Sequence, residues 1–326
     1  MKNVAITYEM EARGRGTVAD ALSGVAQPVW LTDLDAAGRA EALRQADAVL
    51  ARTTRELRPS ELGLLRGIKL LQFVTAGIDH VPLADVPDEV PVAGNGGAYA
   101  EPMAEHAMAM ALAAAKRLPA EHAALARGEF NQFARNRMLA GGVCGILGFG
   151  GIGVAVARLA RAFGMRVHAI NRRGHSGEPT DWIGTPDRLD ALLEAADLLV
   201  ICTPLTPATV GLLGAAELAR MKPDAILVNV ARGEIVDEAA LFAHLQAHPG
   251  FLACIDAWWV EPVRHGSFRV DHPFLALPNV IGSPHNSAAA IAASGTTGLR
   301  RALDNVKRAL AGEAPQHLVA PGDRMM

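Results

Sequence analysis

The sequence has few cysteines and few aromatic residues. Of its 326 residues, 3 are cysteines, and Phe, Trp and Tyr together make up 5%. Cys144, Cys202 and Cys254 lie inside apolar runs, without CxxC spacing or the Cys/His spacing of a zinc site. They indicate buried thiols in a reducing compartment. No cluster of metal ligands is apparent, so we expect no metal.

The chain also lacks an excess of charge and a long apolar run. Lys and Arg total 31 against 34 Asp and Glu, for a formal net charge of -3, and the basic residues are scattered. Nucleic acid is therefore not an expected partner. No apolar run reaches the about 18 residues that span a bilayer, and residues 1–8 resemble a strand rather than a signal peptide. We expect a cytoplasmic protein without a membrane partner.

What is present fits a soluble protein with two cores. Half of the residues are hydrophobic and a fifth are charged, enough to bury a large interior. A length of 326 residues exceeds one ordinary domain. Two domains are therefore the starting expectation.

The first third of the chain predicts a small α/β unit followed by a long helix. Short apolar runs alternate with more polar stretches, at 4–7, 48–51, 70–74 and 91–93. Residues 101–118 are rich in Ala, Met and Glu, with a proline only in the first turn, where its missing N–H costs nothing. We expect one helix over 101–118.

A regular alternation of strand-like and helix-like segments then runs from Val143 to His285. The strand-like runs are 143–149, 166–171, 197–203, 225–230, 251–257 and 279–283. Helix-like segments such as 188–196 and 238–248 lie between them. This order predicts a doubly wound parallel sheet of the Rossmann type.

The last helical pattern, 287–310, lies far along the chain from the first unit, and only a short polar tail follows it. We expect this helix to pack back onto the N-terminal unit, which makes the smaller domain discontinuous. The predicted domains are 1–98 with 288–326, and 99–287. The chain would cross between them near Tyr99 and Asn286, with a cleft between the two bodies.

A glycine-rich turn follows the strand at 143–149. Gly148, Gly150 and Gly153 form a GxGxxG pattern before a helix at 154–163. Gly148 permits the tight turn, Gly150 the approach of a pyrophosphate, and Gly153 close helix–strand packing. The turn, completed by Phe149, Gly151 and Ile152, is the predicted dinucleotide site.

The second strand of this unit ends without the acidic residue that usually binds the ribose of NAD. Asn171 stands at that place and is followed by Arg172 and Arg173. Guanidinium groups bind a 2′-phosphate with paired hydrogen bonds. The sequence therefore favours NADP(H), with NAD(H) as the alternative.

Three polar residues stand at the ends of late strands, where doubly wound folds bind their ligands: Arg232 in VNVARG, Glu261 in DAWWVEP and His285 in SPHN. With these motifs the chain resembles the D-isomer-specific 2-hydroxyacid dehydrogenases. The similarity extends from VLART at 49–53 through MAE at 103–105, CTPLT at 202–206 and MKP at 221–223 to SPH at 283–285. It implies a Rossmann-type domain with a smaller, discontinuous flavodoxin-like α/β domain.

The resemblance implies that Arg232, Glu261 and His285 are catalytic. Reduction of a 2-keto acid delivers hydride to C2 while the carbonyl oxygen gains a proton, which a histidine can supply near neutral pH. Glu261 is expected to orient His285 and to raise its pKa. Arg232 is expected to hold the substrate carboxylate and polarise the carbonyl.

Further contacts follow from the same resemblance. In the loop at 75–79, Ala76 and Gly77 are expected to offer main-chain N–H groups to the substrate carboxylate. Arg52 is a further substrate candidate, although its register against the family is ambiguous and a surface role is an equal alternative. The remaining predicted cofactor contacts are Met103, Thr203, Pro204, Ala231 and Asp256.

The chain departs from the common family pattern at two places. Residues 263–271 form a longer loop than expected, which could cover the cleft. Trp258 and Trp259 stand where smaller or single aromatic residues are usual, which leaves the pocket's shape open, with core packing as the alternative. Glu261 disfavours formate as substrate, because the related formate dehydrogenases carry Gln there.

We therefore expect an oxidoreductase acting on glyoxylate, hydroxypyruvate or a similar keto acid. The alternatives are a dinucleotide-sensing binding protein on the same scaffold and a phosphite-type dehydrogenase. By analogy with the family, the helix at 101–118 suggests a homodimer.

Overall fold

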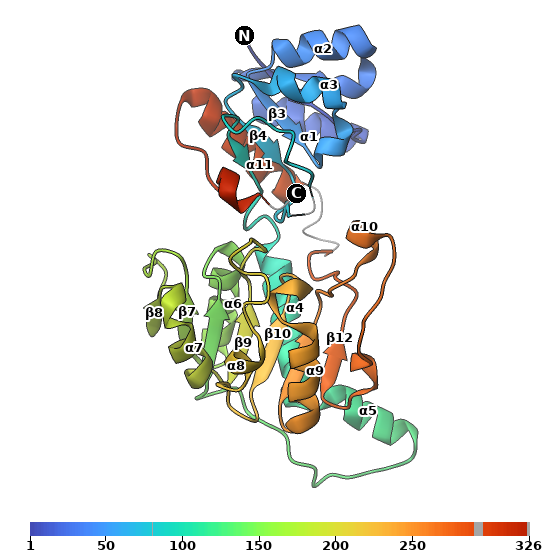
Figure 1. Ribbon diagram of the computed structural model, residues 1–326, viewed down its shortest axis with the longest axis vertical. Helices are drawn as coiled ribbons and strands as arrows, with labels where there is room; N and C mark the ends of the chain where they lie inside the picture. The colour runs from blue at the N-terminus through green and yellow to red at the C-terminus, as the bar shows by residue number, and fades with distance from the viewer. Residues whose placement is uncertain (80, 290–295, 325–326) are drawn as a thin grey trace. The chain divides into compact units, whose positions relative to one another are not determined.

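The computed structural model describes residues 1–79, 81–289 and 296–324. The chain forms two compact units, Met1–Tyr99 with Ala290–Met326, and Ala100–Ala289. Both ends of the chain thus belong to the first unit (Figure 1). We call them unit 1 and unit 2 and describe each by itself.

Unit 1 is built on a five-stranded sheet. Its strands are β1 (Lys2–Ile6), β2 (Ala26–Trp30), β3 (Ala48–Ala51), β4 (Leu71–Phe73) and β5 (Val92–Ala93). They run parallel in the order β2-β1-β3-β4-β5. This is the flavodoxin-like order, so the expected fold of the smaller unit is confirmed.

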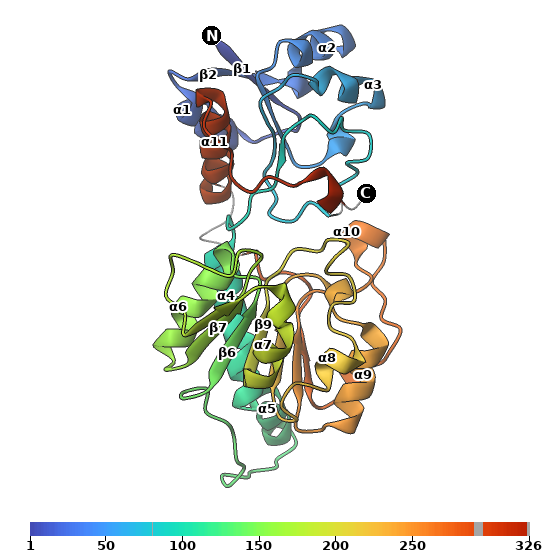
Figure 2. The same cartoon turned by 60° about the vertical axis from the view of Figure 1, so that its left-hand side comes forward.

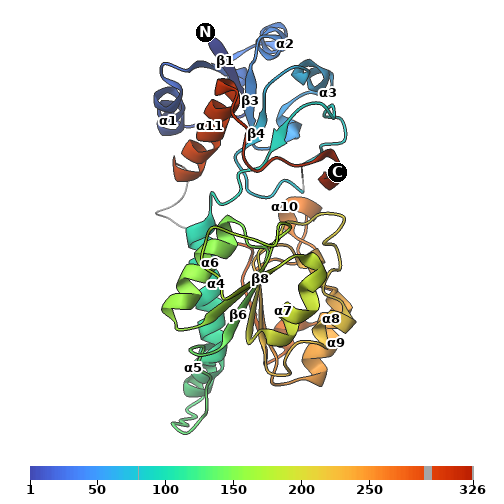
Figure 3. The same cartoon turned by 90° about the vertical axis from the view of Figure 1, so that its left-hand side faces the viewer.

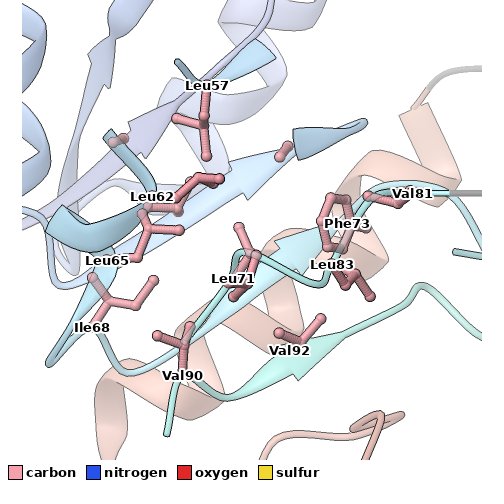
Figure 4. Packing of buried hydrophobic residues seen from close by; sticks show 14 of the residues in the cluster. Leu57, Leu62, Leu65, Ile68, Leu71, Phe73, Val81, Leu83, Val90 and Val92 are labelled. Carbon is pink, nitrogen blue, oxygen red and sulfur yellow. The ribbon is translucent and has the colours of Figure 1, made fainter. Parts of the chain in front are cut away.

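Helices cover both faces of this sheet. Successive side chains along a strand point to opposite faces, and in a parallel sheet both faces are buried. The helices are α1 (Ala12–Leu22), α2 (Ala36–Arg44), α3 (Pro59–Leu62) and α11 (Thr296–Ala311). On one face, Val4, Ile6 and Leu50 pack against α1 and α11, which lie side by side (Figure 2). On the other face, Leu71 and Phe73 pack with leucines of the α2 and α3 side (Figure 4).

Unit 2 is built on a seven-stranded parallel sheet. Its strands are β6 (Val143–Leu147), β7 (Arg166–Ile170), β8 (Trp182–Gly184), β9 (Leu198–Ile201), β10 (Ile226–Asn229), β11 (Leu252–Ile255) and β12 (Val280–Gly282). The order is β12-β11-β10-β9-β6-β7-β8. The order reverses between β6 and β9, which is where doubly wound sheets bind ligands. The predicted Rossmann-type fold is confirmed.

The helices of unit 2 lie on both faces of its sheet (Figure 3). They are α4 (Ala100–Ala115), α5 (Leu118–Ala126), α6 (Gly151–Ala162), α7 (Leu189–Ala195), α8 (Ala215–Leu218), α9 (Glu238–Ala247) and α10 (Pro262–His265). Helices α4 and α6 pack together on one face, while α7, α8 and α9 cover the other.

The predicted helix over 101–118 is wrong at its end, since α4 stops at Ala115 and Arg117 adopts a left-handed conformation with φ of 56°. The cause is Pro119, whose ring would clash with the carbonyl of Ala115 and which has no N–H to donate to it. A separate helix, α5, starts at Leu118.

The start of the last helix also differs from the prediction. Residues 287–289 form a turn rather than the start of the last helix, and residues 290–295 of that prediction lie outside the described residues. The short edge strands β2 and β8 were also missed. Strand β2 contains Pro28, which a strand tolerates at a sheet edge because only one side needs its N–H groups.

Candidate active site

The glycine turn joins β6 to α6. Gly148 has a φ of 103°, and a Cβ there would lie 2.5 Å from the main-chain N of Thr203. A Cβ on Gly153 would lie 2.4 Å from the carbonyl oxygen of Gly148. Only glycine fits these two positions, so the sequence dictates how closely the helix approaches the strand.

Gly150 is different, because a Cβ built there meets no atom within 4 Å. It precedes Gly151, the first residue of α6, whose N-terminal N–H groups favour an anion. The missing side chain thus leaves room directly before a helix N-terminus. This arrangement fits the diphosphate of a dinucleotide, which would be held by main-chain groups of residues 149–153.

The turn after β7 is fixed by Asn171. Its Oδ1 accepts hydrogen bonds from the N–H groups of Arg173, at 2.9 Å, and Gly174, at 2.8 Å. Its Nδ2 donates to the carbonyl of His175 at 3.0 Å. The Asn171 amide therefore shapes the turn that carries Arg172 and Arg173.

Glu261 and His285 form the central pair of unit 2. The Nδ1 of His285 lies 2.8 Å from Oε1 and 2.7 Å from Oε2 of Glu261. The Glu261 side chain is 9% exposed and the His285 side chain 30% exposed, so the carboxylate is buried behind an accessible imidazole. With Nδ1–H donated to the carboxylate, Nε2 is the ring atom left for exchange of a proton.

The surroundings of Glu261 keep it ionised. Burial alone would raise the pKa of its carboxyl, but hydrogen bonds from the His285 imidazole and the Trp258 N–H, with the charges of His285 and Arg232, hold that pKa below its usual value. The Trp258 N–H donates to Oε1 at 2.7 Å. A carboxylate fixed in this way can orient an imidazole and stabilise its protonated form.

Arg232 follows β10, and its positive charge helps to lower the pKa of the Glu261 carboxyl. Its Nη1 donates to the carbonyl of Ala231 at 2.7 Å, and its own carbonyl accepts from Nδ2 of Asn229 at 2.8 Å. Local contacts thus fix both the main chain and the guanidinium. The three predicted catalytic residues are brought together in unit 2.

Asp256 anchors the loop that carries His285. Its side chain is fully buried and accepts from Oγ of Ser283 at 2.5 Å and from the N–H groups of Asn286 and Ser287 at 3.2 Å each. The carbonyl of Asp256 accepts from the His285 N–H at 2.9 Å. These bonds hold His285 in a left-handed conformation with φ of 50°, which is strained for a residue with a side chain.

His106 extends this network from α4. Its Nε2 lies 2.9 Å from Oγ of Ser283 and 3.6 Å from Oδ1 of Asp256. Because the Ser283 hydroxyl donates to Asp256, His106 must donate to Ser283. Sequence reasoning missed His106 and Ser283, since no local pattern reveals a bond between residues 177 positions apart.

The other predicted cofactor residues lie in unit 2 near the strand ends or on α4. Thr203 and Pro204 follow β9, and the Pro204 carbonyl accepts from Oγ1 of Thr209 at 2.8 Å. The N–H of Ala231 donates to Oδ1 of Asn229 at 3.0 Å. Met103 is buried on α4.

The predicted substrate residues lie in unit 1, after neighbouring strands. Ala76 and Gly77 follow β4, and Arg52 directly follows β3. Arg52 donates from Nε to Oε1 of Glu56 at 3.0 Å, and its guanidinium carbon lies 4.6 Å from the ring centroid of Tyr8. The Arg52 side chain is 55% exposed, and Glu56 and Tyr8 both contact its guanidinium group.

Within residues 1–79, 81–289 and 296–324, no helix is long and apolar enough to cross a membrane. No group of three or more His, Cys, Asp or Glu side chains in the same ranges is placed to hold a metal ion.

The doubly wound sheet, glycine turn and Glu–His pair define a dinucleotide-binding α/β protein. Residues 108–287 match the family described as D-isomer specific 2-hydroxyacid dehydrogenase, NAD binding domain. This match covers more than half of the 326 residues. The chain therefore belongs to the D-isomer-specific 2-hydroxyacid dehydrogenase family, as the sequence motifs indicated.

Two curated relatives illustrate the similarity. A D-3-phosphoglycerate dehydrogenase of Methanocaldococcus jannaschii is 30% identical over 86% of this chain and 52% of its own length. A glyoxylate/hydroxypyruvate reductase B of Enterobacter agglomerans is 40% identical over 54% of this chain and 53% of its own length. The chain thus spans about half the length of the D-3-phosphoglycerate dehydrogenase, and its match to the reductase covers about half of each chain.

Solved structures match over nearly the whole chain. A protein of Pyrobaculum aerophilum, provisionally named a formate dehydrogenase, has a TM-score of 0.80 at 27% identity, covering 99% of this chain and 100% of its own. A family member of Xanthobacter autotrophicus Py2, solved with NADPH and MES, has a TM-score of 0.77 at 26% identity, covering 98% of both chains. Both units therefore have the fold of known family members.

Proposed function

We propose that this protein is an NAD(P)-dependent dehydrogenase that transfers a hydride between the nicotinamide and C2 of a small 2-hydroxy or 2-keto acid. The observation that carries the proposal is the Glu261–His285 pair, with 2.7 Å between Oε2 and Nδ1, near the charge of Arg232. Family membership supports the same reaction class.

In this proposal, His285 moves the proton of the reaction. The Nε2 of its imidazole donates a proton to the carbonyl oxygen of a keto acid, or accepts one from the hydroxyl in the reverse direction. Glu261 holds Nδ1 and stabilises the charged ring, while Arg232 binds the substrate carboxylate through its planar guanidinium. The bound nicotinamide supplies or accepts the hydride.

We propose glyoxylate, hydroxypyruvate or a closely similar keto acid as substrate. The name of the Enterobacter agglomerans relative supports this choice. The N–H groups of Ala76 and Gly77 are proposed to bind the substrate carboxylate. The exposed guanidinium of Arg52, fixed by Glu56 and Tyr8, is proposed to add positive charge for an anionic substrate.

We propose that NADP(H) is the preferred cofactor. The Asn171 amide is occupied by the turn that it shapes, and no carboxylate stands at that position for the ribose hydroxyls. Arg172 and Arg173 on this turn are suited to a 2′-phosphate. The Xanthobacter autotrophicus structure, solved with NADPH, is consistent with this choice.

The test is a turnover assay with glyoxylate and hydroxypyruvate, using NADPH and NADH, on the wild type, His285→Ala and Arg232→Ala. We expect turnover, higher kcat/KM with NADPH, and a loss of about 10²- to 10⁴-fold in both variants with dinucleotide binding retained. Equal or better use of NADH would refute the cofactor preference. Tight dinucleotide binding without oxidation on any keto acid would instead support a sensor.

We also propose that the protein is a homodimer. The support is a group of exposed apolar side chains on α5 and the segment after it: Leu118, Leu125, Phe130, Phe133 and Met138, exposed by 56%, 56%, 79%, 83% and 77%. Apolar groups of this kind often mark protein interfaces. Light scattering should give twice the chain mass, and Phe133→Asp should give the single-chain mass; a monomeric wild type would refute the proposal.

A cytoplasmic location is proposed from the three cysteines, all of which are free thiols. Burial raises the pKa of Cys144 and of Cys254 to about 12, so neither forms a thiolate near neutral pH.

A further inference from the structure

The segment from Pro262 to Asp271, longer than expected for the family, is folded against unit 2. It begins as the short helix α10, turns at Gly266 with φ of 78°, and returns so that Arg269 bridges Val260 in antiparallel fashion. The Asp271 N–H donates to Oε1 of Glu238 at 2.7 Å. These contacts make the segment a structured part of unit 2, which we call the return segment.

The return segment contains a shielded ion pair and an exposed one. Nη1 of Arg264 lies 2.6 Å from Oε1 of Glu234, with side chains 15% and 23% exposed. Nε of Arg269 lies 3.4 Å from Oδ1 of Asp271, with side chains 66% and 59% exposed. Because the Arg264–Glu234 pair is shielded from water, removal of one partner leaves a charge that is poorly solvated and lowers stability. The exposed Arg269–Asp271 pair contributes little to stability.

The shielded pair joins the two stretches of main chain that carry the candidate catalytic residues. Glu234 stands two residues after Arg232, and Arg264 three residues after Glu261. Gly233 stands between Arg232 and Glu234, and a Cβ at Gly233 would come within 2.4 Å of the carbonyl carbon of Trp258. The main chain after Arg232 therefore rests directly on the main chain that leads to Glu261.

The return segment also contacts Glu261 itself. The Glu261 N–H donates to Nδ1 of His265, one residue beyond Arg264, at 3.0 Å. Displacement of α10 would therefore disturb the residue that orients the imidazole of His285. The main chain of Arg269 bridges Val260, while its side chain pairs with the exposed Asp271.

We propose that Arg264 is a positioning residue: its ion pair with Glu234 sets the spacing between the Arg232 guanidinium and the Glu261–His285 pair. The inference rests on the proposed dehydrogenase function, in which Arg232 binds the substrate carboxylate and His285 transfers the proton. Small errors in the relative placement of such groups cost rate even when the fold is intact.

The kinetic test compares Arg264→Gln and Glu234→Gln with Arg269→Gln, a matched control in the same segment. We expect kcat/KM for the keto acid to fall about ten- to a hundredfold in the first two variants, with dinucleotide Kd unchanged. The double variant should lose no more kcat/KM than the worse single variant, because both substitutions remove the same ion pair. Arg264→Lys, which keeps the charge, should recover part of the loss.

A second measurement does not depend on turnover. The Nδ1–H proton of His285 should give a low-field NMR resonance, identified by its loss in His285→Gln. We expect this resonance to shift or broaden in Arg264→Gln and to stay unchanged in Arg269→Gln. If no keto acid is turned over, the proposed function fails, and this resonance still decides the positioning role.

Two results would overturn the proposal. One is wild-type kcat/KM in Arg264→Gln together with an unchanged His285 resonance. The other is an equal loss in Arg264→Gln and Arg269→Gln with weaker dinucleotide binding in both, since that would show a general disturbance of unit 2.

Discussion

At the scale of single residues, the left-handed conformation of His285 depends on one buried carboxylate. Asp256 accepts hydrogen bonds from Ser283 and from the N–H groups of the two residues after His285. A residue with a side chain in this region costs of order 1–3 kcal/mol and persists only where its surroundings hold it. Asp256 thus fixes the direction of the imidazole without touching it.

Asp256→Asn tests this role. The amide nitrogen cannot accept a hydrogen bond, so one buried N–H loses its partner, at a cost of about 1–3 kcal/mol in unfolding free energy. We expect this loss in denaturant unfolding, together with a fall in kcat of about tenfold or more as His285 moves. Dinucleotide Kd should be unchanged; a large rise in Kd would show instead that Asp256 acts on the cofactor, as the sequence motif suggested.

The sequence motifs point to individual residues, but they do not predict the long-range contacts that hold those residues in place. Arg232, Glu261 and His285 each stand in a motif with a fixed place after a strand. The bonds of Asp256 with Ser283 and Ser287 join residues 27 and 31 positions apart, and the Arg264–Glu234 pair joins residues 30 positions apart. Contacts of this kind leave no local pattern in the sequence. They become visible only when the strand ends are brought together.

At the scale of elements, the junction of β6 and α6 assigns different tasks to its glycines. Gly153 lies against the carbonyl of Gly148, whereas Gly150 faces open space. The first is needed for packing of the helix on the strand, and the second leaves room for a ligand before the helix N-terminus.

The pair Gly153→Ala and Gly150→Ala separates these tasks. Gly153→Ala should destabilise unit 2 by about 1–3 kcal/mol, because the new methyl overlaps main chain, and should also weaken dinucleotide binding. Gly150→Ala should keep the wild-type Tm and lose dinucleotide affinity. Calorimetry and fluorescence titration check both; wild-type affinity in Gly150→Ala would contradict placement of the diphosphate at this turn.

Elements with strong periodicity were predictable, while short or interrupted ones were not. The strands at the centre of both sheets are apolar runs and were expected. Strand β2 holds Pro28 and polar Gln27, and β8 has three residues, so neither shows a strand pattern. The helix α4 ends three residues earlier than the predicted end at Leu118, since Pro119 cannot donate to the carbonyl of Ala115 and its ring would clash with that carbonyl.

At the scale of the whole molecule, each unit has its own core and its own buried polar links. In unit 1, Nε and Nη2 of Arg39 donate to the two oxygens of Glu61 at 2.9 and 2.8 Å. Burial raises the pKa of the Glu61 carboxyl, but the bonds from Arg39 and the Arg58 N–H outweigh it and bring that pKa below its usual value. This pair ties the segment after β2 to α3.

Glu61→Gln should lower the unfolding free energy of unit 1 by about 3 kcal/mol at pH 7, since Arg39 stays buried without its counter-charge. The pKa of Glu61 is lower in the folded than in the unfolded protein. Its carboxylate therefore contributes fully to the free energy of unfolding above the unfolded pKa of about 4.3, and this contribution is lost as pH falls through the folded pKa. In urea unfolding, the difference in unfolding free energy between wild type and Glu61→Gln should therefore narrow below about pH 4. A difference that stays constant or widens on acidification would contradict the stabilising role of the Arg39–Glu61 pair.

In the proposed reaction, a hydride reaches C2 of a keto acid while His285 supplies the proton. Its most direct test is reduction of glyoxylate with NADPH deuterated at the transferring position of the nicotinamide, followed by NMR of the product. We expect one deuterium on C2 of the hydroxy acid with wild type, and product formed about 10²- to 10⁴-fold more slowly with His285→Gln. Product without deuterium at C2, or equal rates in the two proteins, would contradict it.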